Sequence, residues 1–313
     1  MIFAASLLLG LLIEAALAWP APLFRRIGHP VTWIGRLISA LERGLNRPGD
    51  GVLVQNLRGA LAVGLVLGAV VVPALMIAAL LPGGWVGVVL GGVLAWPLVA
   101  ARSLYDHVAA VARPLSEGRT NDARHAVSMI VGRDPARLDE GGIARAALES
   151  LAENASDGVV APVFWGLLLG LPGLAAYKAI NTLDSMIGHR SPRHESFGMV
   201  AARLDDLVNL LPARLSGLLF ALVSGRLRLS LVTLWRDAGH HRSPNAGWPE
   251  AAMAGALGIR LSGPRIYGDH VAEEPWLNGG ARDPVARDLQ RGLALYRRAM
   301  ILTGCAVALC TLI

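Results

Sequence analysis

The sequence has few cysteines, few aromatic side chains and a single lysine. Two of its 313 residues are cysteine, Cys305 and Cys310, and both lie in the last apolar segment. This count excludes a disulfide framework and a cysteine-based zinc site, so we expect both to be buried small hydrophobic side chains. Lys178 is the only lysine, and arginine therefore carries nearly all of the positive charge.

Charge is absent between Gly59 and Ala101, where no Asp, Glu, Lys, Arg or His occurs. A membrane-spanning helix needs about 20 apolar residues, and the turn at Leu81–Gly84 divides this run into two such helices. The sequence therefore predicts an all-α, polytopic integral membrane helical bundle that forms a single domain over residues 1–313. We expect its membrane segments near 1–19, 59–81, 85–101, 158–177, 215–235 and 295–313.

The first segment resembles a signal peptide at Ala16-Leu17-Ala18. It lacks a positively charged start and contains Glu14, which favours a retained membrane helix. Arginines gather on both sides of 59–101, and this bias predicts cytoplasmic loops near 20–58, 102–157 and 236–290, with the Pro82 turn outside. Because the net charge of +6 is explained by topology and no basic strip is interleaved with aromatic residues, we expect no nucleic-acid partner.

A first acidic cluster precedes the 158–177 segment. Glu149, Glu153 and Asp157 are spaced by four residues, which places them near one face of a helix, with Asn154 beside them. Stacked like charges destabilise a helix, so this spacing indicates a site for a cation or a cationic substrate. A fully solvated acidic face is the alternative.

The uncharged run from Gly158 to Tyr177 raises a topological problem. If it crosses the membrane as one helix, the acidic clusters before and after it lie on opposite sides, and one active site cannot use both. Pro162, Gly170 and the pair Pro172-Gly173 indicate instead a broken or re-entrant helix at 158–177.

Two further polar clusters follow this run. Lys178, Asn181, Asp184 and Ser185 share one helix face at spacings of three and four, and a later group contains Arg203, Asp205, Asp206 and Asn209. Carboxylate and amide oxygens without cysteine suit magnesium, which keeps waters and bridges to phosphates. Lysine and arginine would then neutralise phosphate charge. A network of buried salt bridges is the alternative.

Three loops add candidate binding residues. His29 precedes a proline and a short amphipathic helix, and Arg133 lies where Asp134 and Pro135 are expected to start another helix. The stretch His240–Glu250 leads into a helix near 249–257, whose N-terminus could bind an anion together with Arg242, Ser243 and Asn245. Asp283-Pro284 is expected to cap the final helix. No P-loop motif is present.

Several long motifs follow one another over nearly the whole chain. They are HPVTWIGRLI (29–38), VGRDPARLD (131–139), ESLAENASDGVVAPVFW (149–165), YKAINTLDSMIG (177–188), FGMVAARLDDLVNLLPARL (197–215) and HRSPNAGWPEAAMAGALG (241–258). In sequence and in order they resemble the CobD/CbiB family of adenosylcobinamide-phosphate synthases. One departure is His189-Arg190, where family members often have Tyr-Lys.

The resemblance implies a multi-pass enzyme of the inner cell membrane, with cytoplasmic active-site loops, that acts in cobalamin biosynthesis. Such an enzyme forms an amide between the propionate carboxylate of adenosylcobyric acid, a corrinoid, and aminopropanol or its phosphate, with ATP and Mg²⁺. Its environment is the lipid bilayer, and other enzymes of the pathway are candidate partners. The rival functions are a magnesium-dependent membrane transferase of phosphorylated substrates and a transporter or sensor.

We assign the polar residues to roles in this chemistry. Catalytic roles are predicted for Glu149, Glu153, Asp184 and Lys178. Metal binding is predicted for Asp157, Asp184, Asp205 and Asp206. Substrate binding is predicted for His29, Arg133, Asn154, Asn181, Arg203, Asn209, Arg242, Ser243 and Asn245.

Overall fold

The computed structural model describes residues 2–47, 49–131, 138–189, 191–267 and 270–312. Its elements are α1 (Ile2–Leu17), α2 (Ala21–Ile27), α3 (Pro30–Leu45), α4 (Val52–Leu80), α5 (Gly84–Ala95), η1 (Trp96–Leu98), α6 (Ala101–Ser116), α7 (Thr120–Ser128), α8 (Glu140–Ala155), η2 (Ser156–Val160), α9 (Ala161–Ile187), α10 (Met199–Val223), α11 (Leu227–Asp237), η3 (Ala238–His240), α12 (Gly247–Leu257), β1 (Leu261–Ser262), β2 (Arg265–Tyr267), β3 (His270–Ala272), β4 (Trp276–Leu277) and α13 (Ala286–Cys310). The predicted all-α class is confirmed.

Several helices are long and apolar enough to cross a membrane. Five stretches of the described residues meet this test, and the pair Phe3–Leu17 and Ala21–Leu45, bent by 112°, would make a sixth. The five are Val52–Leu80, Gly84–Ser116, Glu140–Ile187, Met199–Val223 and Ala286–Cys310. The chain is therefore a multi-pass membrane protein, as its composition predicts.

The chain forms two compact units, and both are discontinuous in sequence. The first unit contains Met1–Ala100, Ala161–Asn209 and Ala306–Ile313, and the second contains Ala101–Val160 and Leu210–Cys305. The boundaries fall inside or between consecutive helices, so neither unit is a separate stretch of chain. The single domain expected from the sequence stays a prediction.

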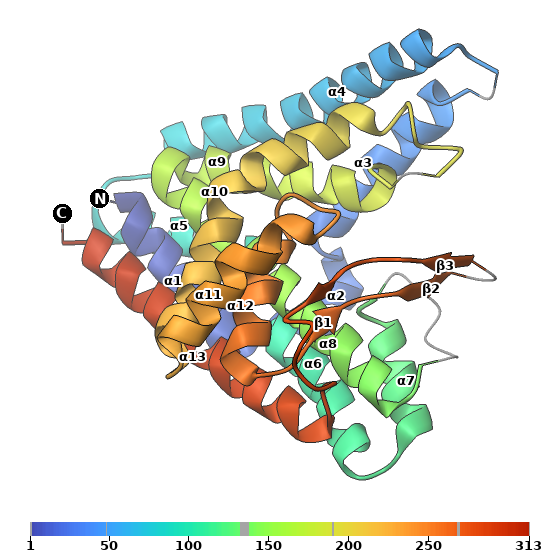
Figure 1. The fold of residues 1–313 in the computed structure, drawn as a ribbon. Coiled ribbons are helices and arrows are strands. Elements are labelled where there is room, and N and C mark those ends of the chain that lie inside the picture. Colours follow the sequence, from blue (N-terminus) through green and yellow to red (C-terminus); the bar gives the residue numbers. More distant parts are fainter. Residues whose placement is uncertain (1, 48, 132–137, 190, 268–269, 313) are drawn as a thin grey trace. The chain divides into compact units, whose positions relative to one another are not determined.

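In the first unit, α4 and α5 are joined by the expected tight turn at Pro82. The helix α4 packs alongside α9, as Figure 1 shows. Their contact continues into the segment after α9, because a Cβ at Gly59 would lie only 1.9 Å from the carbonyl oxygen of Phe197. Only glycine allows this approach. The opposite side of α4 exposes leucines such as Leu61 and Leu65, as expected for a surface that faces lipid.

The helix α9 reverses direction at Gly170, and the predicted break is confirmed. Gly170 has φ 66° and ψ −154°, a conformation that is almost restricted to glycine. A Cβ at Gly166 would lie 3.6 Å from the Cβ of Leu174, whereas eight residues of a straight helix rise about 12 Å. A Cβ at Gly173 would lie 2.5 Å from the carbonyl oxygen of Trp165, so glycine is also needed there.

The two arms of α9 contact neighbouring positions on α10. The indole N–H of Trp165, in the first arm, donates to the carbonyl oxygen of Val208 at 3.0 Å. The hydroxyl of Tyr177, in the second arm, donates to Oδ1 of the next residue, Asn209, at 2.9 Å. The run 158–177 therefore contains a helical hairpin, which corresponds to the re-entrant form expected from its prolines and glycines.

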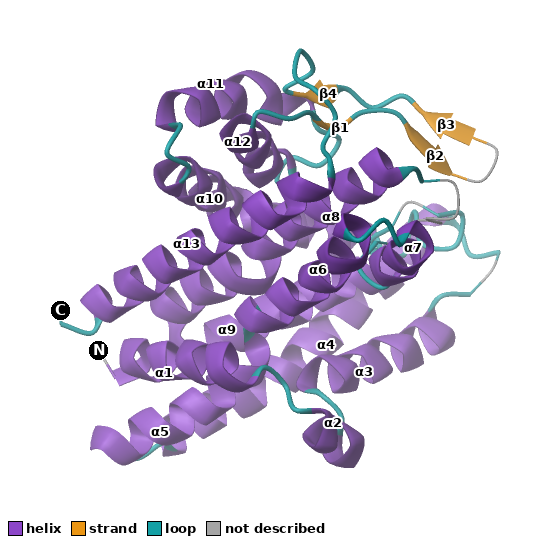
Figure 2. Cartoon of the chain, turned by 90° about the horizontal axis from the view of Figure 1, so that it is seen from below, coloured by secondary structure: helices purple, strands orange, loops and turns teal. Residues whose placement is uncertain are grey.

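In the second unit, α8 lies at the centre of a core rich in alanine. Its buried face includes Ala144, Ala147 and Leu148, and it packs against α6, α7 and α12. Small side chains let these helices approach closely. The helices α11 and α12 lie side by side (Figure 2). Near them β1 pairs antiparallel with β4, while β2 pairs with β3.

Some helix boundaries and side-chain environments differ from the sequence-based expectations. The segment expected near 215–235 is divided between α10 and α11, because the chain turns at Gly225, where φ is 68°. The prediction that both cysteines are buried is wrong. Cys305 and Cys310 are both exposed on α13.

Candidate carboxylate–amide site

A cluster of carboxylates and amides forms in the first unit between the second arm of α9 and the start of α10. We call it the carboxylate–amide cluster, and it consists of Tyr177, Asn181, Asp184, Asp205, Asp206 and Asn209. The charges of Asp184 and Asp206 act on Asp205, and the amide of Asn181 approaches the same carboxylate. The two groups that the sequence indicated separately therefore belong to one site.

Asn209 holds Asp205 in place. Its Oδ1 accepts the hydroxyl of Tyr177 at 2.9 Å, and its Nδ2 donates to Oδ2 of Asp205 at 2.9 Å. Asn209 and Tyr177 are each 1% exposed, so both ends of the amide are used inside the protein. The predicted substrate-binding role of Asn209 stays a prediction, while the structure gives it a positioning role.

Asp205 keeps one oxygen without a partner. Its Oδ1 is buried and makes no hydrogen bond within the described part of the chain. A buried carboxylate oxygen left unpaired is costly, and such atoms are common where a ligand or an ion binds. Asp184 lies nearby on α9, where its Oδ1 would be 1.9 Å from a Cβ at Gly188.

Lys178 and His29, both predicted site residues, lie near this cluster in the first unit. Lys178 is half-buried one turn before Asn181 on α9, and its charge acts on His29. Nδ1 of His29 accepts the backbone N–H of Val31 at 3.2 Å, so a neutral His29 ring carries its proton on Nε2. His29 is therefore set up to donate a hydrogen bond. Arg203, by contrast, is exposed.

The carboxylates of the cluster are few, and magnesium needs only a few protein ligands. Among the residues that the structure describes, no three His, Cys, Asp or Glu side chains form a group that could hold a metal ion. Magnesium is usually bound by only one or two carboxylates, and waters and phosphate oxygens fill its other positions. Asp205 and Asp184 fit this second arrangement. Asp157, the fourth predicted metal ligand, belongs to the second unit.

The first acidic cluster, Glu149, Glu153 and Asp157, lies in the second unit, and its three carboxylates have different environments. Glu149 is 6% exposed, and it accepts a hydrogen bond from the backbone N–H of Ser262 at 2.8 Å. Glu153 and Asn154 are exposed, and Asp157 is half-buried in the π-helical turn η2. This turn changes the helical repeat, so the regular spacing of four does not continue to Asp157. The catalytic roles of Glu149 and Glu153, the substrate-binding role of Asn154 and the metal-binding role of Asp157 stay predictions.

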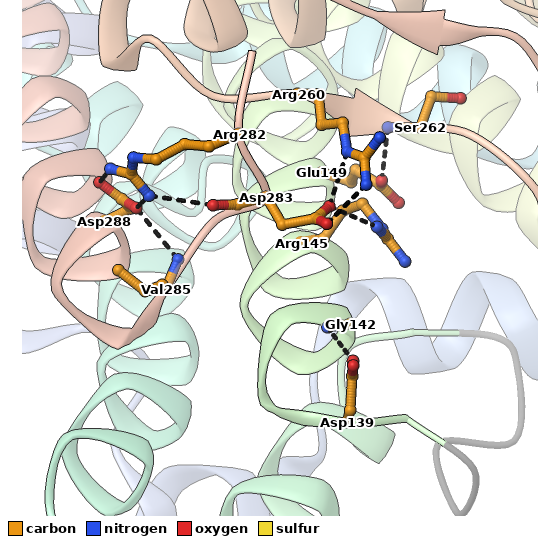
Figure 3. A network of polar contacts seen from close by, with 10 residues as sticks. All are labelled: Asp139, Gly142, Arg145, Glu149, Arg260, Ser262, Arg282, Asp283, Val285 and Asp288. Atoms are coloured by element: carbon orange, nitrogen blue, oxygen red, sulfur yellow. Dashed lines mark hydrogen bonds and ion pairs between the residues drawn. The ribbon is translucent and has the colours of Figure 1, made fainter. Parts of the chain in front are cut away.

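A second polar network surrounds Asp283, as Figure 3 shows. Arg260 donates to both oxygens of Asp283, at 2.9 and 2.6 Å, and Arg145 of α8 donates to one of them at 3.2 Å. Both guanidinium groups lie over the ring of Trp276, 4.1 and 4.9 Å from its centre. The expectation that Asp283 caps the final helix is wrong, because its side chain is used in this network.

This network was not predicted from the sequence. The only signal was the four-residue spacing of Arg145 and Glu149 on α8, because their partners lie more than a hundred residues away in the chain. The helix α8 begins at Glu140. Asp139 is its N-cap and accepts the N–H of Gly142 at 2.7 Å. Arg133 and the predicted start at Asp134 and Pro135 lie outside the described residues.

The loop before α12 uses many of its donors internally. Oγ of Ser243 accepts the backbone N–H groups of Asn245 and Ala246, both at 3.2 Å, and Nδ1 of His241 accepts the N–H of Ser243 at 3.0 Å. These amides are therefore not available to an anion, in contrast to the expectation from the sequence. Arg242 lies 3.6 Å from the carboxylate of Glu274. The substrate-binding roles of these residues stay predictions.

The chain was compared with known proteins. Residues 7–296 match the model of the family described as CobD/Cbib protein. The chain belongs to the CobD/CbiB family. A Rhodobacter capsulatus relative named cobalamin biosynthesis protein CobD is 64% identical over 298 residues, which cover 95% of this chain and 94% of the relative. Relatives of the same name from Brucella suis biovar 1 and Sinorhizobium fredii are 50% and 45% identical, and they cover 96% and 98% of this chain and 94% and 96% of their own lengths.

No solved structure matches the chain. Membership of the CobD/CbiB family assigns the protein to cobalamin biosynthesis, and a corrinoid substrate and a bilayer environment are consistent with this assignment. The family match also includes both halves of the carboxylate–amide cluster.

Proposed function

We propose that this chain forms the amide bond between the propionate carboxylate of adenosylcobyric acid and the amine of (R)-1-amino-2-propanol or its O-phosphate. The product is adenosylcobinamide or its phosphate, and the reaction consumes ATP in the presence of Mg²⁺. The proposal places the protein in the inner cell membrane, with its polar loops in the cytoplasm. It makes the protein a carbon–nitrogen ligase.

One observation supports this proposal most directly. In a multi-pass membrane protein of cobalamin biosynthesis, the carboxylates of Asp184 and Asp205 come together from two helices. A buried oxygen of Asp205 has no hydrogen bond to any of the residues that the structure describes. A buried carboxylate oxygen without a partner is costly and is often found where a ligand binds. A ligase that handles phosphate needs hard oxygen ligands of this kind.

The proposed reaction has two steps. The propionate oxygen attacks the γ-phosphorus of ATP, the bond to the β-phosphate oxygen breaks, and an acyl phosphate and ADP form. The neutral amine nitrogen then attacks the acyl carbon, the C–N bond forms, and the C–O bond to phosphate breaks. Inorganic phosphate leaves, and the nitrogen loses one proton to a base. Splitting one difficult step into two easier ones is the usual advantage of such an intermediate.

The residues of the carboxylate–amide cluster have distinct roles in this scheme. Asp205 and Asp184 would hold Mg²⁺, which, when bound, neutralises phosphate charge and orients the transferred group. Asn209 and Tyr177 fix the orientation of the Asp205 carboxylate through their hydrogen bonds. Lys178 and the Nε2–H of His29 would bind an anionic group, such as a phosphate or the propionate.

The decisive experiment is an amide-forming assay. Purified protein in detergent is incubated with adenosylcobyric acid, ATP and Mg²⁺, together with either aminopropanol or its phosphate, and corrinoid products are identified by mass. We expect a product of the amide mass that is absent when EDTA is added. Folded protein that forms no product with either amine would contradict the proposal and favour transport or sensing.

Asp205→Asn tests the role of the cluster. The substitution keeps the shape of the side chain and removes the charge, so we expect the amide-forming rate to fall about 100-fold, in the range found when metal ligation is disturbed. Asp106→Asn is the control, since the side chain of Asp106 is 54% exposed on α6, where it pairs with Arg102 at 3.3 Å. Full turnover by folded Asp205→Asn protein would remove Asp205 from the mechanism.

A further inference from the structure

The connection between α9 and α10, residues 188–198, is tied to α3 by a buried carboxylate. Glu42 of α3 is 9% exposed, and the guanidinium group of Arg193 donates to both of its oxygens, at 2.6 and 3.0 Å. This two-point geometry fixes both the distance and the orientation of the partners. The two residues are 151 positions apart in sequence.

Two more side chains complete this contact. Nδ2 of Asn46 lies 2.9 Å from the carbonyl oxygen of Arg193 and 3.3 Å from Oε1 of Glu42, and it donates to both. Nε2 of His194 lies 3.4 Å from the same Oε1. We call these four residues, Glu42, Asn46, Arg193 and His194, the Glu42 latch. Both the backbone and the side chains of the connection are thereby held.

Close backbone approaches fix the two ends of the same connection. A Cβ at Gly198 would lie 1.6 Å from the carbonyl oxygen of Ile187, and a Cβ at Gly59 would lie 1.9 Å from that of Phe197. Neither position can accept a side chain without moving the backbone. Phe197 and Gly198 are therefore fixed by backbone contacts, and the Glu42 latch holds Arg193 and His194 of the same connection.

The carboxylate–amide cluster lies immediately before and after this connection. Asp184 ends the polar face of α9 and contacts Gly188, and the charge of His189 acts on it. Asp205 lies less than two turns into α10, which begins at Met199. The conformation of 188–198 therefore determines how the face of α9 meets the face of α10.

We infer that Glu42 is a positioning residue for the carboxylate–amide cluster. Through Arg193 and Asn46 it holds the 188–198 connection, which in turn sets the separation of Asp184 and Asp205. An ion pair with an exposed partner contributes little net stability. The two-point contact of Arg193 with Glu42 instead selects one arrangement of the two segments. The inference rests on the proposed function, because the geometry that it selects is the one assigned to magnesium.

The test compares Glu42→Gln, Arg193→Gln and the double variant with Glu195→Gln. Glu195 is exposed on the same connection, so its substitution makes the same change of charge outside the latch. We expect the Mg²⁺ concentration for half-maximal amide formation to rise about tenfold in each latch variant. The double variant should lose no more than either single variant, because both remove one contact.

Hydrogen exchange provides a readout without substrate. Residues 188–198 should exchange faster in both latch variants, and Glu195→Gln should match the wild type. If Glu42→Gln does not fold, Arg193→Gln decides the question, because the side chain of Arg193 is 61% exposed. Folded latch variants with the Mg²⁺ dependence and the turnover of the wild type would overturn the inference while leaving the proposed function intact.

Metal binding tests the positioning role of Glu42 even if the proposed amide-forming activity is wrong. If wild-type protein forms no amide, Mn²⁺ binding is measured by electron paramagnetic resonance for the wild type, Asp205→Asn and Glu42→Gln. Weaker binding by both variants would support the positioning role of Glu42. Equal binding by wild type and Glu42→Gln, or no binding by the wild type, would overturn it.

Discussion

Asp283 carries the clearest electrostatic effect in the second unit. The hydrogen bonds from Arg260 lower the pKa of this carboxyl, burial opposes them weakly, and the charges of Arg260 and Arg145 lower the pKa further. Asp283 and Arg260 lie on the segment that follows α12, whereas Arg145 lies on α8. The interaction therefore joins this segment to α8, next to the contact between Glu149 and Ser262.

We expect this contact to stabilise the protein at neutral pH and to lose its effect in acid. An unfolded Asp has a pKa of about 3.9, and the folded value is lower, so the contribution is fully present above about pH 4 and is lost as pH falls through the folded pKa. Because the side chain is 45% exposed, its size is about 0.5–1 kcal/mol. The melting temperature of Asp283→Asn should be lower than that of the wild type at pH 7.

The measurement is thermal unfolding in detergent between pH 7 and pH 3. The difference between Asp283→Asn and the wild type should shrink as the pH falls below about 4. Asp106→Asn serves as the control, because its carboxylate contacts Arg102 at 3.3 Å on an exposed helix surface. A difference that stays constant with pH would show that the charge of Asp283 is not responsible.

At the level of single residues, the sequence predicted correctly which side chains share a helix face, because this depends on helical spacing alone. The spacing of Asn181 and Asp184, and of Asp205 and Asn209, correctly places these residues on helix faces. It cannot say which partner each side chain meets. Asn209 hydrogen-bonds to Tyr177 and Asp205. Glu149 hydrogen-bonds to the backbone of Ser262. In both cases a tertiary contact satisfies a buried polar group.

At the scale of elements, the hairpin in α9 is the least ordinary feature of the fold. Hydropathy alone counts Glu140–Ile187 as a membrane span, yet the backbone reverses at Gly170 inside it. The geometry permits a direct test. A Cβ at Gly166 would lie 3.6 Å from the Cβ of Leu174, within the range that a disulfide requires.

We expect the double variant Gly166→Cys and Leu174→Cys to form an intramolecular disulfide. The native cysteines are first replaced by serine, and the product is detected by the loss of two free thiols and by intact mass. In a straight helix the two positions would be about 12 Å apart, too far for this bond. The Cβ at Gly166 would also lie 3.2 Å from a methyl group of Leu7, so this side chain must shift slightly.

The control has the same spacing of eight residues in a continuous helix. Gly64→Cys and Val72→Cys both lie in α4, so they should not form a bond within the chain. If the α9 pair stays reduced under conditions that oxidise an accessible dithiol, the hairpin is wrong.

The sequence was sufficient to predict that the main helices exist, but it was not sufficient to predict where they begin and end. The α4–α5 pair follows from an uncharged run divided by a Pro-Gly turn, and both helices are present. The ends of α10 and α11 depend on Gly225, whose positive φ stops one helix. The π-helical turn η2 leaves no signal in the spacing of polar residues, because in the sequence Glu149, Glu153 and Asp157 keep a regular spacing of four through it.

At the scale of the molecule, the length of α4 in the first unit can be compared with the thickness of a bilayer. Gly59 contacts the segment that follows α9, and Leu80 ends α4 just before the Pro82 turn. The intervening helix rises about 32 Å, close to the hydrocarbon thickness of about 30 Å. The carboxylate–amide cluster and the Pro82 turn should therefore lie at opposite membrane surfaces.

Cysteine labelling in membrane vesicles of known orientation tests this arrangement. In a background without Cys305 and Cys310, we expect Ser185→Cys to react with an impermeant maleimide from the cytoplasmic side only. Gly83→Cys should react from the outer side only, since arginines such as Arg43 and Arg58 keep their end of α4 in the cytoplasm. Reaction of both from the same side would exclude α4 as a membrane span.

The division into two units is a property that the sequence does not show. Each unit collects stretches from distant parts of the chain, because packing depends on which helix faces match rather than on their order. Composition and run length were sufficient for the membrane class. They are insufficient for grouping helices, since apolar side chains cover both lipid-facing and protein-facing surfaces.

Lys178 gives the protein a chemical reporter in the place where one is most useful. Since it is the only lysine, a reagent specific for ε-amino groups can modify a single side chain in the whole chain. That side chain is half-buried one turn from Asn181 on α9. The rate at which such a reagent acylates intact protein would therefore report ligand binding near the carboxylate–amide cluster, in membranes and in mixtures of ligands, without any catalytic turnover.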